Sequence, residues 1–221
     1  MVTMQNNIDR FIEALMLIVN AGANKTFNHS ARVSEVAVKI AEKMDLNQGV
    51  VERIQIAAYL HDIGKIAISD QILNKPGRLK RSELKEVQKH PEFAYNILER
   101  LPLFKKVSRI ILHHHERYDG LGYPKGLKGK VIPLEARIIA VADAFDAMTS
   151  DRPYRKALNY DQAYSEINDH VNEQFCPLVV ECFNQLNFAD LLENMKGQQI
   201  DNFAHVIAVE HEILSHSRKI I

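Results

Sequence analysis

The sequence is poor in cysteine, has no excess of either charge sign and lacks any long apolar run. Its two cysteines, Cys176 and Cys182, have neither metal-like nor redox-like spacing. A disulfide framework is therefore not expected, which suggests a reducing compartment. Lys+Arg and Asp+Glu balance at 28 each, so no general attraction to nucleic acid or acidic membranes is predicted. The run from Ala14 to Val19 is far shorter than the roughly 20 residues needed to span a bilayer, and the N-terminus has no signal-like cleavage site. These absences predict a cytoplasmic protein that binds neither DNA nor membrane.

Histidine is the residue present in unusual number, with ten copies. One copy stands in the stretch Leu60-His61-Asp62-Ile63-Gly64-Lys65, at the end of an apolar helical run. Adjacent imidazole and carboxylate groups suit divalent transition metals of intermediate hardness, and Lys65 could then meet an anionic substrate. Because His-Asp pairs also occur by chance, the interpretation depends on whether other segments bring ligands to the same place.

The spacing of apolar residues predicts helices along most of the chain and no strand. Gly64 is expected to end the helix before it, Ser82 to act as an N-cap, and Pro91 to sit in a first helical turn. The glycine- and proline-rich segment Glu116 to Pro133 is predicted to be a long functional loop. The expected helices begin at Ile8 and then cover about 29–44, 48–61, 82–90, 91–101, 107–115, 133–149, 160–175, 177–186 and part of 200–221.

Titratable side chains recur on the helix faces that should turn inward. Asp143 lies in a stripe of small residues, and His29 belongs to an apolar stripe. A buried titratable group is costly unless a cation or a hydrogen-bond donor meets it. A single such residue is more often a satisfied core histidine or a surface aspartate, but several together predict a shared metal cluster. The set exceeds the roughly four to six ligands that one ion takes, so two ions bridged by a carboxylate are expected: His29, His61, Asp62, His90, His114, His115 and Asp143.

A series of motifs resembles the HD-GYP proteins, a subgroup of the HD-domain metal-dependent phosphohydrolases. The matching segments are His29-Ser30-Ala31-Arg32-Val33, His61-Asp62-Ile63-Gly64-Lys65, His90-Pro91, His114-His115-Glu116, Asp119-Gly120-Leu121-Gly122-Tyr123-Pro124, Val141-Ala142-Asp143-Ala144-Phe145-Asp146-Ala147-Met148-Thr149 and Arg152-Pro153-Tyr154-Arg155. The resemblance covers about residues 27–183. It implies an all-α HD-domain helical bundle with a long GYP loop, a site for two or three iron or manganese ions, and phosphodiesterase activity on cyclic dinucleotides. We expect a catalytic domain over 1–187 and a C-terminal helical extension, 188–221, packed on it.

The resemblance also implies roles for individual residues. Asp62 would bridge two ions and Lys65 would meet a phosphate oxygen, which makes these the predicted catalytic residues. Arg152 and Arg155 would grip the substrate phosphates, although they could also be surface charges. Tyr123 would shape the mouth of the pocket as a substrate-binding residue, or it could simply anchor the loop. In the family this loop is also implicated in protein contacts.

The chain departs from the family pattern at Lys25. Family members with three metals carry a glutamate at this position, four residues before the first histidine. A charged lysine cannot ligate a metal, so two ions, iron or manganese, are predicted rather than three. Two-metal members tend to stop at the linear dinucleotide, which is therefore the expected product.

Several functional alternatives remain open from the sequence. Cyclic di-GMP is the favoured substrate and 3′,3′-cyclic GMP-AMP is the alternative. The two stay open because no residue in the sequence is identified as hydrogen-bonding to a guanine base. A cyclic-dinucleotide receptor with little hydrolysis is a second hypothesis, and a nucleotidase acting on mononucleotides is a third. Further expected partners are a regulatory domain or protein bound through the GYP loop, and a second copy of the chain in a homodimer.

Overall fold

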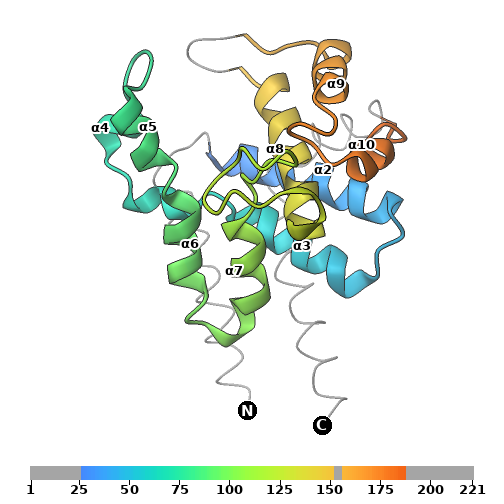
Figure 1. The fold of residues 1–221 in the computed structure, drawn as a ribbon, viewed down its shortest axis with the longest axis horizontal. Coiled ribbons are helices and arrows are strands. Elements are labelled where there is room, and N and C mark those ends of the chain that lie inside the picture. Colours follow the sequence, from blue (N-terminus) through green and yellow to red (C-terminus); the bar gives the residue numbers. More distant parts are fainter. Residues whose placement is uncertain (1–25, 152–155, 188–221) are drawn as a thin grey trace.

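The computed structural model describes residues 26–151 and 156–187, which form a helical bundle (Figure 1). Within this part of the chain there is no β-strand, and an isolated bridge between Val171 and Phe175 is the nearest approach to one. The all-α prediction is therefore confirmed. The expected helix from Ile8, the C-terminal extension, Lys25, Arg152 and Arg155 lie outside the described residues.

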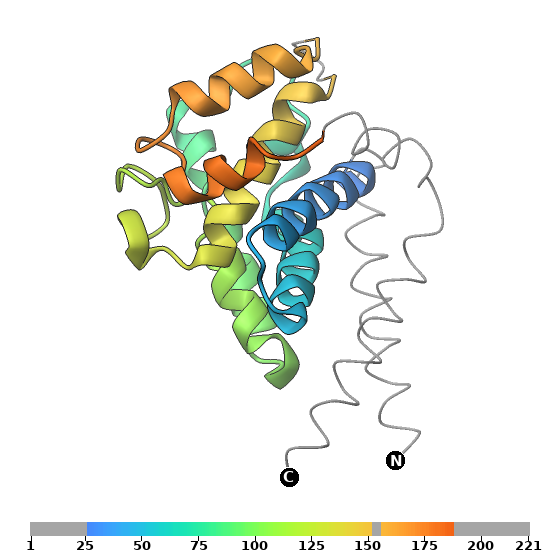
Figure 2. The same cartoon turned by 90° about the vertical axis from the view of Figure 1, so that its right-hand side faces the viewer.

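Three helices form the centre of the bundle. Helix α2 (Thr26–Lys43) packs against α3 (Gln48–Leu60) and against α8 (Leu134–Thr149). Figure 2 shows α2 and α3 side by side, with α8 crossing them. Asn47 caps α3 by accepting a hydrogen bond from the Val50 amide. The largest fully buried side chains come mainly from these helices and their neighbours: Ile40, Ile54, Leu60, Leu98, Ile111, Ile138, Ile139, Phe145 and Phe183.

The remaining helices surround this centre. The 3₁₀ turn η1 (Ile63–Ala67) and α6 (His90–Leu98) pack together, and α7 (Lys105–Leu112) contacts both α6 and α3. Helices α4 (Asp70–Leu73) and α5 (Arg81–Val87) extend to one side of the bundle (Figure 1). The 3₁₀ turns η2 (Pro102–Phe104) and η3 (Gly129–Val131) precede α7 and α8, and α9 (Tyr160–Asp169) and α10 (Pro177–Phe183) follow α8.

Gly64 has a different structural role from the predicted one. Helix α3 already ends at Leu60, and His61 at its C-cap keeps right-handed backbone angles. A Cβ atom on Gly64 would lie 2.0 Å from the His90 carbonyl oxygen and 2.7 Å from the Ala94 amide nitrogen. The glycine therefore allows η1 to approach the backbone of α6.

Other helix boundaries also differ from their predictions. Lys80, not Ser82, is the N-cap of α5. The side chain of Glu83, in the first turn, accepts hydrogen bonds from the Lys80 amide and the Lys75 ammonium, and so holds the start of the helix. The helix predicted over 160–175 ends at Asp169. Beyond it the chain turns through Asn172, which has a φ of 67°. Pro91, in contrast, lies in the first turn of α6, as predicted.

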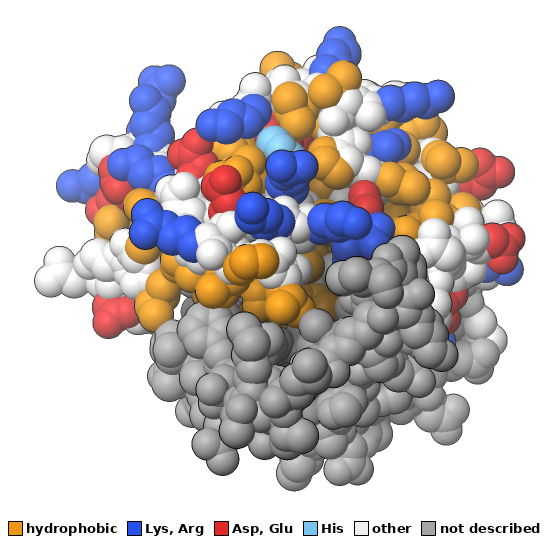
Figure 3. All heavy atoms as spheres, turned by 90° about the horizontal axis from the view of Figure 1, so that it is seen from below, with side chains coloured by type: hydrophobic (Ala, Val, Ile, Leu, Met, Phe, Trp, Pro, Cys, Tyr) orange, Lys and Arg blue, Asp and Glu red, His pale blue; other side chains and the backbone are white. Residues whose placement is uncertain are grey.

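The described surface carries both charge signs. On the face seen in Figure 3, Lys and Arg side chains are interspersed with acidic and apolar ones. No described helix is both long and apolar enough to cross a membrane.

Candidate metal centre

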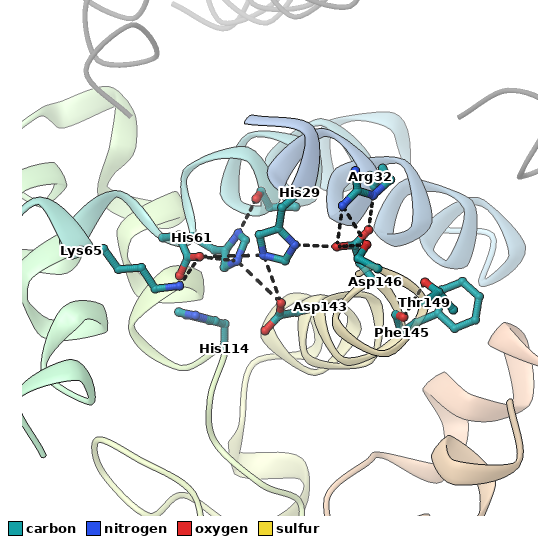
Figure 4. Close-up of polar contacts among 12 residues, drawn as sticks. His29, Arg32, His61, Lys65, His114, Asp143, Phe145, Asp146 and Thr149 are labelled. Carbon is teal, nitrogen blue, oxygen red and sulfur yellow. Dashed lines mark hydrogen bonds and ion pairs between the residues drawn. The ribbon is translucent and has the colours of Figure 1, made fainter. Parts of the chain in front are cut away.

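All seven side chains predicted as metal ligands converge on one region between the helices. His29 comes from α2 and Asp143 from α8, while His61 and Asp62 directly follow α3. Figure 4 shows His29, His61 and Asp143 turned toward one another, with His114 nearby. Three overlapping groups each bring their donor atoms within 4.8 Å of one another: His29, His61, Asp143; His61, Asp62, His114; and His90, His114, His115.

Asp62 lies between the two sides of this cluster. Its Oδ2 atom is 3.5 Å from His61 Nε2 and 3.8 Å from His29 Nε2, whereas its Oδ1 atom is 3.4 Å from His90 Nε2. Asp62 is only 4% exposed, so protein side chains rather than bulk water surround its carboxylate. Each oxygen of Asp62 thus faces a different set of histidines.

Helix ends orient three of the histidines. The Nδ1 atoms of His61, His90 and His114 lie 2.7, 2.8 and 2.6 Å from the carbonyl oxygens of the residues three positions earlier. These carbonyls are in the last turns of α3, α5 and α7, where helical partners are missing. The contacts fix the tautomer with hydrogen on Nδ1 and leave Nε2 free to ligate a metal.

The helical placement predicted for His114 and His115 is wrong, although both residues reach the cluster. Helix α7 ends at Leu112, and the His113 amide donates to carbonyls of the last turn. The chain then bends, so that the His114 and His115 rings lie against each other, with centroids 4.0 Å apart and ring planes tilted by 40°. His113 points elsewhere, as predicted, and lies near Glu116.

His29 is oriented by a carboxylate that we did not single out from the sequence. Its Nδ1 lies 2.7 Å from Asp146 Oδ2, and its Nε2 lies 3.3 Å from Asp143 Oδ1. Asp146 is one helical turn after Asp143 and 1% exposed. This i, i+3 spacing within a histidine- and aspartate-rich set of motifs was the available signal.

Most of the clustered side chains are in the protonation state that binds a metal: neutral for histidine and ionised for aspartate. Burial lowers the pKa of His90 and His114, and it lowers the pKa of His115 to about 3, so these imidazoles are neutral. Burial opposes the ionisation of Asp62 and Asp143, but Lys65 beside Asp62 and the hydrogen bond from His29 to Asp143 help to outweigh it, so both pKa values lie far below their usual range.

His29 behaves differently from the other histidines. Burial alone would lower its pKa, but Asp143 and Asp146 outweigh burial and raise it to about 9. Without a metal, a proton therefore occupies His29 between these two carboxylates. Five imidazoles and two carboxylates form a donor set that fits divalent transition metals.

The two remaining described residues with predicted roles both contact this cluster. The Lys65 ammonium lies 2.5 Å from Asp62 Oδ2, and its side chain is 37% exposed. The Tyr123 ring packs on His115 with centroids 4.8 Å apart, and the Tyr123 amide donates to the His115 carbonyl at 3.2 Å. Tyr123 thus anchors the loop on a proposed ligand, which was the alternative interpretation of this residue.

Glu116 holds the long loop in place. Its side chain is buried, and its two oxygens accept hydrogen bonds from the amides of Lys125 at 2.8 Å and Leu127 at 3.0 Å. The loop backbone also donates from Tyr118 and Asp119 to carbonyls in the turn after α9. A side chain at Gly122 would lie 2.3 Å from the Arg117 amide, so the loop can fold back only with glycine there.

Known proteins with similar sequences and folds support a common family. The family model described as "HD domain" matches residues 13–179. A cyclic di-GMP phosphodiesterase of Thermotoga maritima is 42% identical over 79% of this chain and 48% of its own length. A 3′3′-cGAMP-specific phosphodiesterase of Vibrio cholerae is 38% identical over 82% of this chain and 40% of its own length.

A solved structure gives the same answer for the fold. An HD-GYP-type protein from Bdellovibrio bacteriovorus superposes with a TM-score of 0.60 at 24% sequence identity, covering 76% of this chain and 52% of that one. The chain spans about half the length of the curated relatives it matches. The chain belongs to the HD-domain family, and its resemblance to the HD-GYP phosphodiesterases is confirmed.

Proposed function

We propose that this chain is the catalytic part of a metal-dependent phosphodiesterase that opens a cyclic dinucleotide. The observation that carries this proposal is the convergence of five histidines and two aspartates from separate elements around Asp62. Cyclic di-GMP is the favoured substrate and 3′,3′-cyclic GMP-AMP the alternative, because relatives of both kinds match the chain. The linear dinucleotide is the expected product.

We assign two ions, iron or manganese, to the cluster. One would be held by His29, His61 and Asp143, and the other by His90, His114 and His115. Asp62 would be shared, since its two oxygens face different histidines. Such ions supply Lewis acidity, which withdraws electron density from phosphate and makes water acidic enough to lose a proton near neutral pH.

The chain's own side chains would bind the substrate phosphates beside this centre. Lys65 is half-buried, next to Asp62, so its ammonium can turn from that carboxylate to a phosphate oxygen. There it would offset the negative charge that grows in the transition state. Arg152 and Arg155 are proposed to hold the second phosphate. Tyr123 is proposed to contact substrate at the mouth of the pocket, and its packing on His115 would also keep the loop in place.

The proposed setting is cytoplasmic signalling. A regulatory domain or protein would contact the GYP loop, where Leu121 is 80% exposed and Val131 72% exposed. We further propose that residues 1–187 form the catalytic domain, that 188–221 pack on it, and that the chain can form a homodimer.

Incubation of the Mn²⁺- or Fe²⁺-loaded protein with a panel of cyclic dinucleotides, followed by product identification, tests this function. We expect conversion of cyclic di-GMP to the linear dinucleotide, with no turnover of mononucleotides. Mononucleotide hydrolysis alone would instead establish a nucleotidase. Tight binding of a cyclic dinucleotide without product would favour the receptor, although a receptor would not need a complete ligand set.

A further inference from the structure

The histidines of the metal centre differ in what holds the ring nitrogen that faces away from it. His61, His90 and His114 use carbonyls at helix ends. His29 lies inside α2, where carbonyls are engaged in the helical hydrogen bonds. Its outer nitrogen instead meets Asp146, a carboxylate from α8.

Asp146 is itself held from several directions. Arg32 Nε donates to Asp146 Oδ1, and Arg32 Nη2 donates to Oδ2 at 3.1 Å. The Ser150 hydroxyl lies 3.4 Å from Oδ2 and accepts from Arg32 Nη2 at 2.9 Å. Figure 4 shows Asp146 between His29 and Arg32. Because both oxygens are engaged, the carboxylate is fixed before any metal arrives.

We propose that Asp146 is a positioning residue of the metal centre, which acts through His29. By accepting the Nδ1 hydrogen it presents the Nε2 lone pair toward Asp62 and Asp143, and Arg32 keeps the carboxylate in place. A carboxylate behind a ligating imidazole also makes that imidazole a stronger donor. Asp146 is therefore expected to matter for the ion on the His29 side and not for the ion on the His90 side.

This inference rests on the proposed metal centre, and the test separates the two. Asp146→Asn keeps the size of the side chain but removes its charge. Mn²⁺ affinity is measured by competition with a chelator, and ions are counted by elemental analysis. We expect one of two ions to bind about 10- to 100-fold more weakly, and the other to stay within about threefold. A wild-type protein that binds no Mn²⁺ would overturn the metal centre itself, whereas unchanged affinities in the variant would overturn only the role of Asp146.

A double-mutant cycle shows whether the effect passes through His29. In a His29→Ala background, Asp146→Asn should cause no further loss of metal affinity. A second loss of about tenfold or more would contradict the inference, because Asp146 would then act by another route. The visible absorption spectrum of the Co²⁺-loaded protein provides a readout that a purely structural residue would not change. The absorption bands of bound Co²⁺ should shift in the Asp146→Asn variant.

Asp169→Asn is the matched control, since Asp169 is an exposed helical aspartate near only the Ser165 hydroxyl among the contacts described. It should leave affinities and spectrum unchanged. If circular dichroism shows that Asp146→Asn does not fold, Asp146→Glu is the second variant. It keeps the negative charge that pairs with Arg32 but displaces the His29 ring by about the length of one methylene group. A folded Asp146→Glu with wild-type affinity for both ions would overturn the inference.

Discussion

The two histidine groups on either side of Asp62 are built by different means. His29 and His61 share their group with Asp143 and come from α2, α3 and α8, the helices packed at the centre of the bundle. The other group, His90, His114 and His115, lies at the start of α6 and just beyond α7, beside the long loop.

This difference separates two ways of fixing a ligand. In the first group, His61 is held by a main-chain carbonyl, but His29 depends on one buried side chain, Asp146. In the second group, His90 and His114 depend on main-chain carbonyls, which no single substitution removes, and His115 depends on its packing against Tyr123. The first group is therefore sensitive to point changes behind it, and the second to changes in the loop.

Loss of Asp62 should affect both histidine groups equally. Asp62→Ala removes the carboxylate that faces both, so we expect loss of both ions and a fall in turnover of at least about 10³-fold. Elemental analysis and product formation measure the two effects. The exposed Asp161 supplies the control, Asp161→Ala. Full hydrolysis by a metal-free Asp62→Ala protein would refute the metal-assisted mechanism.

Substitution of one proposed ligand in each group should remove one ion and leave the other bound. His29→Ala and His115→Ala are each expected to retain about one ion per chain and to lose turnover by about 10²- to 10³-fold. Titration with Mn²⁺ counts the remaining sites. If either substitution removed both ions, the two groups would be one site rather than two.

The loop offers a way to weaken the second group alone. Glu116→Gln replaces a charged acceptor of two loop amides with a neutral one, which should destabilise the fold by about 1.5–3 kcal/mol and loosen Tyr123 on His115. We expect weaker binding of the ion on the His90 side only. Urea unfolding and Mn²⁺ titration measure these effects.

Glu92→Gln is the matched control for Glu116→Gln. Glu92 also contacts Lys125, but through an exposed ion pair at 2.9 Å, and such pairs contribute little. Equal effects of the two substitutions would show that the loop is not held by Glu116.

The pH dependence of the chelator-treated protein should also differ between the groups. The pKa of His115 is lowered from 6.5 to about 3 in the folded protein. Between these pH values only the unfolded chain binds the proton, so the free energy of unfolding falls as pH drops from 6.5 toward 3. His29, with its pKa raised to about 9, stabilises the fold below pH 6.5 and loses this contribution as pH rises to 9. Each slope is about 1.4 kcal/mol per pH unit.

The free energy of urea unfolding at pH 5, 7 and 9 tests both slopes. His115→Ala should flatten the acidic limb and His29→Ala the alkaline one. Identical profiles for the two variants would contradict the assignment of opposite shifts.

The sequence predicted which side chains converge because each is a polar residue at a position that the apolar pattern marks as buried. His29 and Asp143 are examples, and the structure brings both to the cluster. The pattern could not reveal what lies behind a ligand, because the partner of His29 is 117 residues away in the chain. Such a contact depends on how α2 and α8 pack.

Helix ends were predicted less well than helices. Periodicity continued through His114 and His115, but the helix stops at Leu112, where the chain must bend to direct two consecutive rings inward. The predicted helix over 160–175 failed for a similar reason, since carbonyls of Glu173 and Gln174 are needed by the loop amides. In both places tertiary contacts overrode the local pattern.

The contact at Gly64 has a consequence for how the site can change. The spacing between Asp62 and His90 is set where two stretches of main chain touch, with no side chain between them. Substitutions elsewhere in the core can alter the stability of the bundle without altering this spacing. The distance between the two halves of the centre is therefore a property of the backbone, and it can stay constant while the surrounding core and the substrate pocket diverge in sequence.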